Sequence, residues 1–160
     1  MGNTLNHKLA VYLIALGVVS VLLLLVHQRF AVTVTPSLRY KVFYLKDRSG
    51  SEIRRGDYVL FNLDHPVTRE LSFKKTIKQV ACASGDRLSV IDRDYYCNGL
   101  FIGRAKDLSL RNEQVTNFVY SGEVPSSSLF VMGHSRDSYD SRYFGFIGSN
   151  DIEKMAYPLF

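Results

Sequence analysis

A long apolar stretch without a charged side chain occupies the N-terminal part of the chain. Residues 9–26 read LAVYLIALGVVSVLLLLV, and the next charge is Arg29. A helix of about 20 such residues spans a bilayer, whereas a cleaved signal peptide has an apolar core of about 7–15 residues before a small-x-small site. The following HQRFAVTV offers no such site, and an all-round apolar segment at a terminus is a poor core helix. We therefore predict a short tail at residues 1–8 and an uncleaved transmembrane anchor at residues 9–28.

Beyond residue 28 the helical pattern gives way to short runs rich in β-branched and aromatic residues, separated by Gly, Asp, Asn and Ser. The runs are YKVFYL, DYVLFN, TIKQVACA, LSVI and SLFVMG. Such runs are typical of strands bounded by turns. The predicted fold class is mainly β: one transmembrane helix, followed by a single, mostly antiparallel domain at residues 29–160.

Three segments between these runs have patterns of their own. Asn98-Gly99 separates YYC from LFIG and predicts a hairpin, because a two-residue type I′ turn needs positive φ at both positions. Arg55-Gly56-Asp57 is interpreted as turn chemistry and not as an adhesion motif. Residues 104–128 are more polar and less periodic, and we predict a surface excursion there.

The charge pattern narrows the choice of partners. The net charge is +5, from 20 Lys and Arg residues against 15 Asp and Glu residues. The basic residues are interleaved with acidic ones and no nucleic-acid motif accompanies them, so we predict no nucleic-acid partner and favour a surface beside anionic lipid. Lys8 precedes the span whereas Arg29, Arg39 and Lys41 follow it, so the positive-inside rule leaves the orientation open.

The two cysteines, Cys82 and Cys97, lie at the ends of neighbouring predicted strands. Outside the cytoplasm they could form a disulfide, which would close a loop of about 15 residues and stabilise the fold by about 3 kcal/mol. Two buried thiols are the alternative. The histidines are scattered and make no ligand cluster, so no metal and no cofactor is predicted. They are His7, His27, His65 and His134.

Lys78 is the first candidate for chemistry. It lies in KTIKQVACASGD, where strand alternation places it on one face with Thr76, Val80 and Cys82. Desolvation on such a mostly apolar face lowers the pKa of a lysine from about 10.4 toward about 7–8, where the neutral amine can act as a general base. A snorkelling lysine, or a lysine on an edge strand, would explain the same pattern without catalysis.

Ser37, in VTVTPSLRY, lies about ten residues beyond the anchor. As a nucleophile it would act at the membrane surface and would need a base such as a desolvated lysine; otherwise it is a turn residue after Pro36. A triad of a serine with His134 and Asp140 lacks a motif around the nucleophile. The polar run GHSRDSYDSRYFGF predicts a structured loop, in which Asp140 and Arg142 could form an ion pair.

Four blocks in this order resemble one known family. TPSL contains the membrane-proximal serine, RGDYVLF is similar to GDIVVF, KQVACASGD is similar to KRVVGLPGD, and GHSRDSYDSRYFG is similar to GDNRDNSxDSRYFG. The chain thus resembles the bacterial type I signal peptidases, the Ser-Lys endopeptidases of the S26 class, over residues 10 to about 150. The resemblance implies a signal-peptidase-like catalytic domain on the periplasmic or outer face of the bacterial inner membrane.

The resemblance also implies roles for individual residues. Ser37 would attack the scissile carbonyl and Lys78 would take its proton. Thr35 and the Ser37 backbone N–H would donate to the oxyanion. Ser138 would orient the lysine amine, although the block is one residue shorter here and the gap could be placed otherwise. Asp140 and Arg142 would give structural support.

Two departures from the family pattern narrow the expected substrate. The SGSMxPTL block is reduced to TPSL, and only 47 positions separate Asp86 from Gly133, so a large second β region has little room. Both traits are similar to the small TraF-type peptidases of conjugative transfer systems, which mature pilin precursors and in some members cyclise them. We therefore expect a pilin or transfer precursor as substrate and other transfer-apparatus proteins as partners.

Two alternatives to a hydrolase remain open, and a third, a self-cleaving Ser-Lys repressor, is not favoured because the sequence shows no DNA-binding domain. A transpeptidase that cyclises pilin would share the acyl-enzyme with a hydrolase, so sequence does not separate the two. A non-catalytic assembly subunit of a secretion apparatus would keep the fold and tolerate loss of Ser37 or Lys78. A self-cleaving repressor would carry a DNA-binding domain in place of the anchor.

Overall fold

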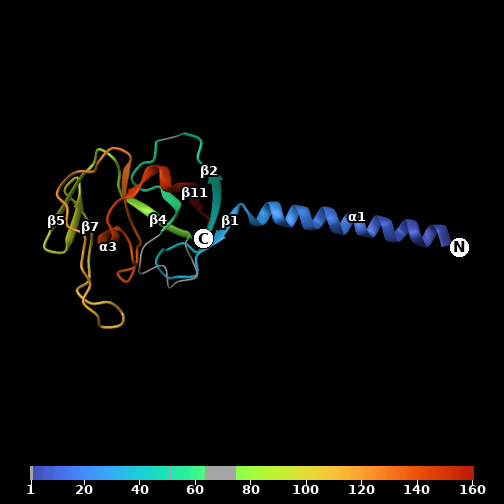
Figure 1. Ribbon diagram of the computed structural model, residues 1–160, viewed down its shortest axis with the longest axis horizontal. Helices are drawn as coiled ribbons and strands as arrows, with labels where there is room; N and C mark the ends of the chain where they lie inside the picture. The colour runs from blue at the N-terminus through green and yellow to red at the C-terminus, as the bar shows by residue number, and fades with distance from the viewer. Residues whose placement is uncertain (1, 51, 64–74) are drawn as a thin grey trace.

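The N-terminal residues form one long helix that stands away from the rest of the molecule. The computed structural model describes residues 2–50, 52–63 and 75–160. Helix α1, Gly2–His27, projects from the β domain (Figure 1). Its window His7–Leu24 is apolar and long enough to cross a membrane, and none of that window is buried against the domain. Helix α1 begins at Gly2, and no proline or glycine lies between residues 3 and 8.

The remaining described residues form two antiparallel sheets. The first has the order β1-β2-β11-β3-β4-β9-β10 and the second has the order β7-β6-β5-β8. Strands of the first sheet are β1 Phe30–Val32, β2 Val42–Asp47, β3 Tyr58–Asn62, β4 Lys75–Cys82, β9 Ser128–Met132, β10 Ile147–Gly148 and β11 Ile152–Pro158. Strands of the second are β5 Arg87–Ile91, β6 Asp94–Cys97, β7 Leu100–Arg104 and β8 Gly122–Glu123. Two short helical turns are α3 Ser141–Phe144 and η1 Ser149–Asp151.

The mainly β, antiparallel fold class is confirmed, and each of the five runs contains a strand. The predicted hairpin is also confirmed, because Asn98 and Gly99 have φ of 51° and 79° between β6 and β7. Gly56 has φ of 98° in the turn before β3, which a residue without a side chain adopts without strain.

The prediction of a surface excursion over residues 104–128 is wrong for its two ends. Ala105 and Val124 are each 1% exposed and pack into the core of the second sheet. Phe118 and Tyr120 stack with ring centroids 6.2 Å apart and are partly buried against the same core. Isolated apolar residues in a polar context thus anchor the segment, and only its middle part protrudes (Figure 1).

The core lies in three clusters that position the strands around β4. One cluster contains Val59 and Val80, and a second joins the two sheets through residues such as Tyr95 and Phe130. The third holds Leu38, the residue after Ser37, against aromatic and aliphatic side chains of β2, β3 and β4. Burial of Leu38 therefore fixes the loop that carries Ser37 to the first sheet.

A disulfide links the two sheets at the end of β4. The structure joins Cys82, the last residue of β4, to Cys97, the last residue of β6, and both are fully buried. The Asp86 carboxylate also lies close to both sulfurs. Cys82, Asp86 and Cys97 are the one group of three potential metal-binding residues in the part of the chain that the structure describes. The sulfurs are bonded to each other, so they are not thiolate ligands.

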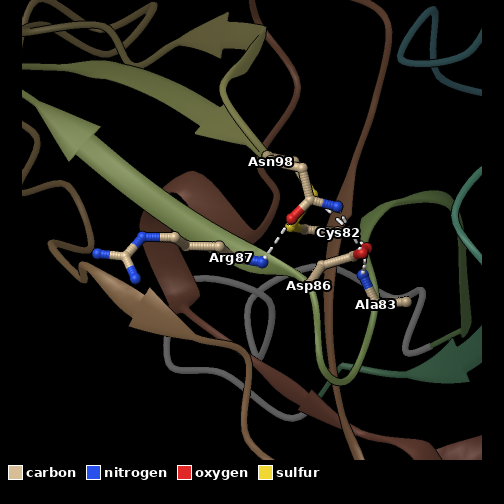
Figure 2. The surroundings of a disulfide bond; sticks show 6 residues. Cys82, Ala83, Asp86, Arg87 and Asn98 are labelled. Atoms are coloured by element: carbon tan, nitrogen blue, oxygen red, sulfur yellow. Dashed lines mark hydrogen bonds between the residues drawn. A yellow bond between two sulfur atoms is a disulfide. The ribbon is translucent and has the colours of Figure 1, made fainter.

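Hydrogen bonds around the disulfide hold the two adjacent turns together (Figure 2). The Asp86 carboxylate accepts from the Ala83 N–H at 2.9 Å and from the Asn98 side-chain amide at 2.8 Å. The side-chain amide oxygen of Asn98 in turn accepts a hydrogen bond from the Arg87 backbone N–H at 2.7 Å. The turn after β4 and the β6–β7 hairpin turn therefore form one connected unit.

The paired substitution Cys82→Ala with Cys97→Ala is expected to lower the free energy of unfolding by about 3 kcal/mol, because the bond closes a loop between residues 15 apart. Denaturant titration of the full chain in detergent micelles measures the difference. Reducing agent should destabilise the wild type to a similar extent and leave the variant unchanged. A reductant effect of equal size on both proteins would contradict the assignment.

Candidate active site

Lys78 is a buried lysine in the middle of strand β4. It lies opposite Val59 of β3, and its side chain is only 4% exposed. Its amine donates a hydrogen bond to the Ser138 hydroxyl at 2.7 Å. Burial lowers its pKa to about 8; the charge of Arg142 adds to that effect and the charge of Asp140 opposes it. At neutral to mildly alkaline pH a substantial fraction of this amine is therefore unprotonated and able to accept a proton.

The loop between β1 and β2 presents Ser37. Its carbonyl oxygen accepts hydrogen bonds from the backbone N–H groups of His134 and Ser135, at 2.7 and 3.1 Å. Its hydroxyl lies 3.1 Å from the Thr35 hydroxyl. With Leu38 buried on one side and the backbone bonds on the other, the Ser37 backbone has little freedom.

The close contact between the Ser37 loop and residues 133–138 requires a glycine. A Cβ atom on Gly133 would lie 2.7 Å from the Ser37 carbonyl oxygen and would also collide with the Ser138 side chain. The Gly133 N–H donates to the Asp140 carboxylate at 2.9 Å. The loop that carries Ser138 is therefore pressed against the loop that carries Ser37.

A buried ion pair braces the segment on which Ser138 lies. Asp140 and Arg142 are 0% and 3% exposed, and two nitrogens of the guanidinium each lie 2.8 Å from a carboxylate oxygen. Asp140 also caps helix α3 by accepting from the Arg142 backbone N–H. The remaining donors of Arg142 bond to backbone carbonyls, including those of Ser135 and Ser138. Each charge of this pair compensates the other inside the protein. Removal of either partner would leave one buried charge uncompensated and would destabilise the fold.

A cleft of about 910 Å³ brings the predicted site residues together. Ser37, Lys78, Thr35 and Ser138 all line it, whereas Asp140 and Arg142 lie behind Ser138. Thr76 and Ile77 line the cleft beside Lys78. Its walls are mostly apolar side chains from β1, β2, β3 and β4. A hydroxyl, a buried amine and a mostly apolar cleft are the elements of nucleophilic attack on a peptide bond.

Comparison with known proteins decides the family. The family model of signal peptidase, peptidase S26, matches residues 5–157. The chain belongs to the peptidase S26 family of signal peptidases. A crystal structure of a signal peptidase I from Enterococcus faecalis V583 is 25% identical in sequence, covers 66% of this chain and 97% of its own, and superposes with a TM-score of 0.42. No curated protein matches the chain.

Membership of the S26 signal peptidases makes the chain a serine peptidase that acts on preproteins, in a family that is usually anchored in the membrane.

His134 has a position that sequence reasoning did not find. The sequence suggests neither a triad nor a metal site for it, yet its backbone N–H donates a hydrogen bond to the Ser37 carbonyl oxygen. Its Nε2 atom lies 3.5 Å from the Tyr58 hydroxyl, and the two rings are 6.1 Å apart. Burial and the charge of Arg39 lower the pKa of His134, so its ring is neutral at physiological pH. A contact between residues 97 positions apart leaves no local signal in the sequence.

Lys78→Met is expected to make this S26 peptidase more stable at pH 7, by about 1–3 kcal/mol. The shift from 10.5 to about 8 corresponds to about 3 kcal/mol at about 1.4 kcal/mol per pH unit, less about 1 kcal/mol for the lost Ser138 hydrogen bond. Between pH 8 and 10.5 the unfolded chain holds the proton and the folded chain does not, so the stability of the wild type rises with pH across that window.

The free energy of unfolding, measured by denaturant titration at pH 7 and pH 10.5, checks this prediction. The advantage of Lys78→Met should shrink toward the higher pH, whereas Lys46→Met at an exposed position of β2 should show no such trend. A variant that is less stable than the wild type by the same amount at both values would show that the buried amine is not destabilising.

Proposed function

We propose that the chain is a membrane-anchored endopeptidase with a Ser-Lys dyad, in which Ser37 is the nucleophile and Lys78 the general base. The observation that carries the proposal is the buried Lys78 amine, hydrogen-bonded to Ser138 on a cleft that Ser37 also lines. A lysine acts as a base only where its surroundings lower its pKa, and burial does so here.

Lys78 takes the hydroxyl proton of Ser37 as the oxygen attacks the scissile carbonyl of the precursor. The Ser37 backbone N–H and the Thr35 hydroxyl donate to the oxyanion that forms, because the Thr35 hydroxyl lies 3.1 Å from the attacking oxygen. Collapse of the tetrahedral intermediate breaks the C–N bond of the precursor, and the Lys78 ammonium gives its proton to the leaving amine. A water molecule, deprotonated by the same amine, then hydrolyses the acyl-enzyme on Ser37.

Ser138 and the ion pair act through Lys78. The Ser138 hydroxyl fixes the direction of the amine, and Asp140 with Arg142 holds the backbone around Ser138 in place. A loose lysine in an apolar cleft would adopt several rotamers, and misplacement by about 1 Å slows proton transfer considerably.

We place the anchor, residues 9–28, in the bacterial inner membrane, with residues 1–8 before it and the peptidase domain, residues 29–160, on the periplasmic or outer face. Two observations support this placement. Helix α1 is apolar and stands free of the domain. The Cys82–Cys97 disulfide is typical of an oxidising compartment. The cleft includes residues of β1, which directly follows α1, so the cut would occur close to the bilayer.

The proposed substrate is a pilin or another precursor of a conjugative transfer system, delivered by partner proteins of that apparatus. The reduced TPSL block supports a dedicated substrate. The small second sheet supports it as well, because β5 to β8 all lie within residues 87–123 and leave little room for further substrate-binding structure.

Ser37→Ala and Lys78→Ala are each expected to lower kcat for cleavage of a pilin precursor by more than about 1000-fold, because the two groups act as a unit. Gel electrophoresis and mass spectrometry of the product measure the effect. Lys46→Ala, on an exposed position of β2, is the matched control and should cleave normally. Unchanged processing by either catalytic variant would mean that the dyad is wrong or that the chain serves as an assembly subunit.

The mass of the product separates hydrolysis from cyclisation. A linear mature chain supports the hydrolase, whereas a product lighter by one water would show that an amine accepts the acyl group and would replace the hydrolase by a transpeptidase with the same dyad. A generic preprotein cleaved far faster than the pilin precursor would overturn the proposed substrate and leave the dyad intact.

A further inference from the structure

The connection between β7 and β8 contains a protruding segment that we call the arm, residues 106–115 (Figure 1). Hydrogen bonds run between its two limbs. The Val115 N–H donates to the Asp107 carbonyl at 2.9 Å, and the Ser109 N–H donates to the Glu113 carbonyl at 2.8 Å. The arm is therefore a braced, hairpin-like element and not an open loop.

Arg93, before β6, holds both limbs of the arm at their base. Its guanidinium forms an ion pair with Asp107 and donates to the backbone carbonyls of Lys106, at 2.7 Å, and Val115, at 3.3 Å. The Arg93 side chain is only 18% exposed, so its guanidinium lies largely within the protein, whereas the Asp107 side chain is 71% exposed. The arm consequently keeps a fixed direction relative to the second sheet.

The base of the arm is also attached to the loop that carries Ser138. The Lys106 amine lies 2.5 Å from the Asp137 carboxylate, and the Lys106 N–H donates to the Tyr143 hydroxyl at 3.0 Å. Asp137 immediately precedes Ser138 and lines the cleft itself. The arm and the proposed catalytic loop are thus positioned by the same contacts.

Leu110 lies near the outer turn of the arm, and its side chain is 80% exposed. It lines the same cleft as Ser37 and Lys78, although it lies outside both sheets. The Ser109 hydroxyl accepts from the backbone N–H groups of Arg111 and Glu113, which fixes the turn that presents Leu110. Leu100 of β7 and Val119 are also exposed, but they do not line the cleft.

We infer that the arm is a wall of the substrate cleft and that Leu110 is a specificity-determining residue that contacts an apolar side chain of the precursor. The inference rests on the proposed peptidase function and adds a substrate contact to it. A leucine held at the mouth of an apolar cleft loses its exposed surface when a peptide binds, whereas a flexible loop would first have to be ordered. The contact between Leu110 and the peptide is equally strong in the bound ground state and in the transition state. Its loss should therefore raise KM and leave kcat unchanged.

The first test measures cleavage of a synthetic peptide that spans the cleavage site of the pilin precursor and carries apolar residues on both sides of the cut, using the full-length enzyme in detergent micelles. Leu110→Ser should raise KM by about 5- to 20-fold, which is about 1–2 kcal/mol of apolar contact at 1.4 kcal/mol per tenfold change, and should leave kcat within about twofold. The matched controls Leu100→Ser and Val119→Ser should behave like the wild type.

A series of peptides, each with one apolar residue near the cut replaced by Ser, identifies the contact. At one peptide position the effect of the replacement should largely disappear in Leu110→Ser, because the two changes remove the same interaction. Overturning results are an unchanged KM, a fall in kcat alone, or replacement effects that are additive at every position.

The second test does not depend on cleavage. A photoreactive benzoylphenylalanine at position 110, in a Ser37→Ala background, should cross-link to the bound peptide, whereas the same group at position 100 should not. If the wild-type enzyme leaves the peptide intact, the proposed function fails while cross-linking still decides the inference. Equal cross-linking at both positions, or none at position 110, would overturn the role of Leu110.

Discussion

The hydrogen bond from the Lys78 amine to the Ser138 hydroxyl is the contact on which the arrangement of the cleft depends. It joins the middle of strand β4 to a loop 60 residues further along the chain. The same loop reaches the Ser37 carbonyl through the backbone of His134 and Ser135, and it does so because Gly133 leaves room for the approach. Lys78, Ser138 and Ser37 are therefore held through one short stretch of backbone.

Burial of a lysine opposes folding, and the surroundings of Lys78 show how the fold tolerates it. The ion pair between Asp140 and Arg142 satisfies its own charges and fixes the backbone next to Ser138. At its far end, β4 is tied to the second sheet by the Cys82–Cys97 disulfide. A strand fixed at its end and within its sheet can keep one unfavourable side chain in a single position, which is the state that a general base requires.

Local patterns predicted the strands β2 to β7 and β9, because each of these carries its own signal, whereas β1, β8, β10 and β11 were not among the predicted runs. The run from Tyr58 to Asn62 and the Asn98-Gly99 turn have the residue types that their backbone conformations need. The disulfide could be proposed but not decided from sequence, because the register that brings Cys82 near Cys97 is a tertiary property. The same reason explains why the shorter block around Ser138 could be aligned in more than one way.

Other features had no local signal at all. The polar residues of the arm predict an exposed excursion and nothing more, because its bracing comes from Arg93, a residue outside the segment. The backbone contact of His134 with Ser37 follows only once two distant loops meet. Sequence patterns therefore predicted most of the strands and the residue types of the candidate site. The contacts that position these residues follow only from the three-dimensional structure.

Direct titration of the Lys78 amine tests the central claim. Heteronuclear NMR of the lysine Cε and Nζ resonances, with Lys78→Met to assign the signal, follows protonation of this one group in the full-length protein. The account predicts a midpoint at a pH of about 8, about two units or more below the ordinary value of 10.5 for a lysine side chain. A midpoint at about 10.5 would contradict it.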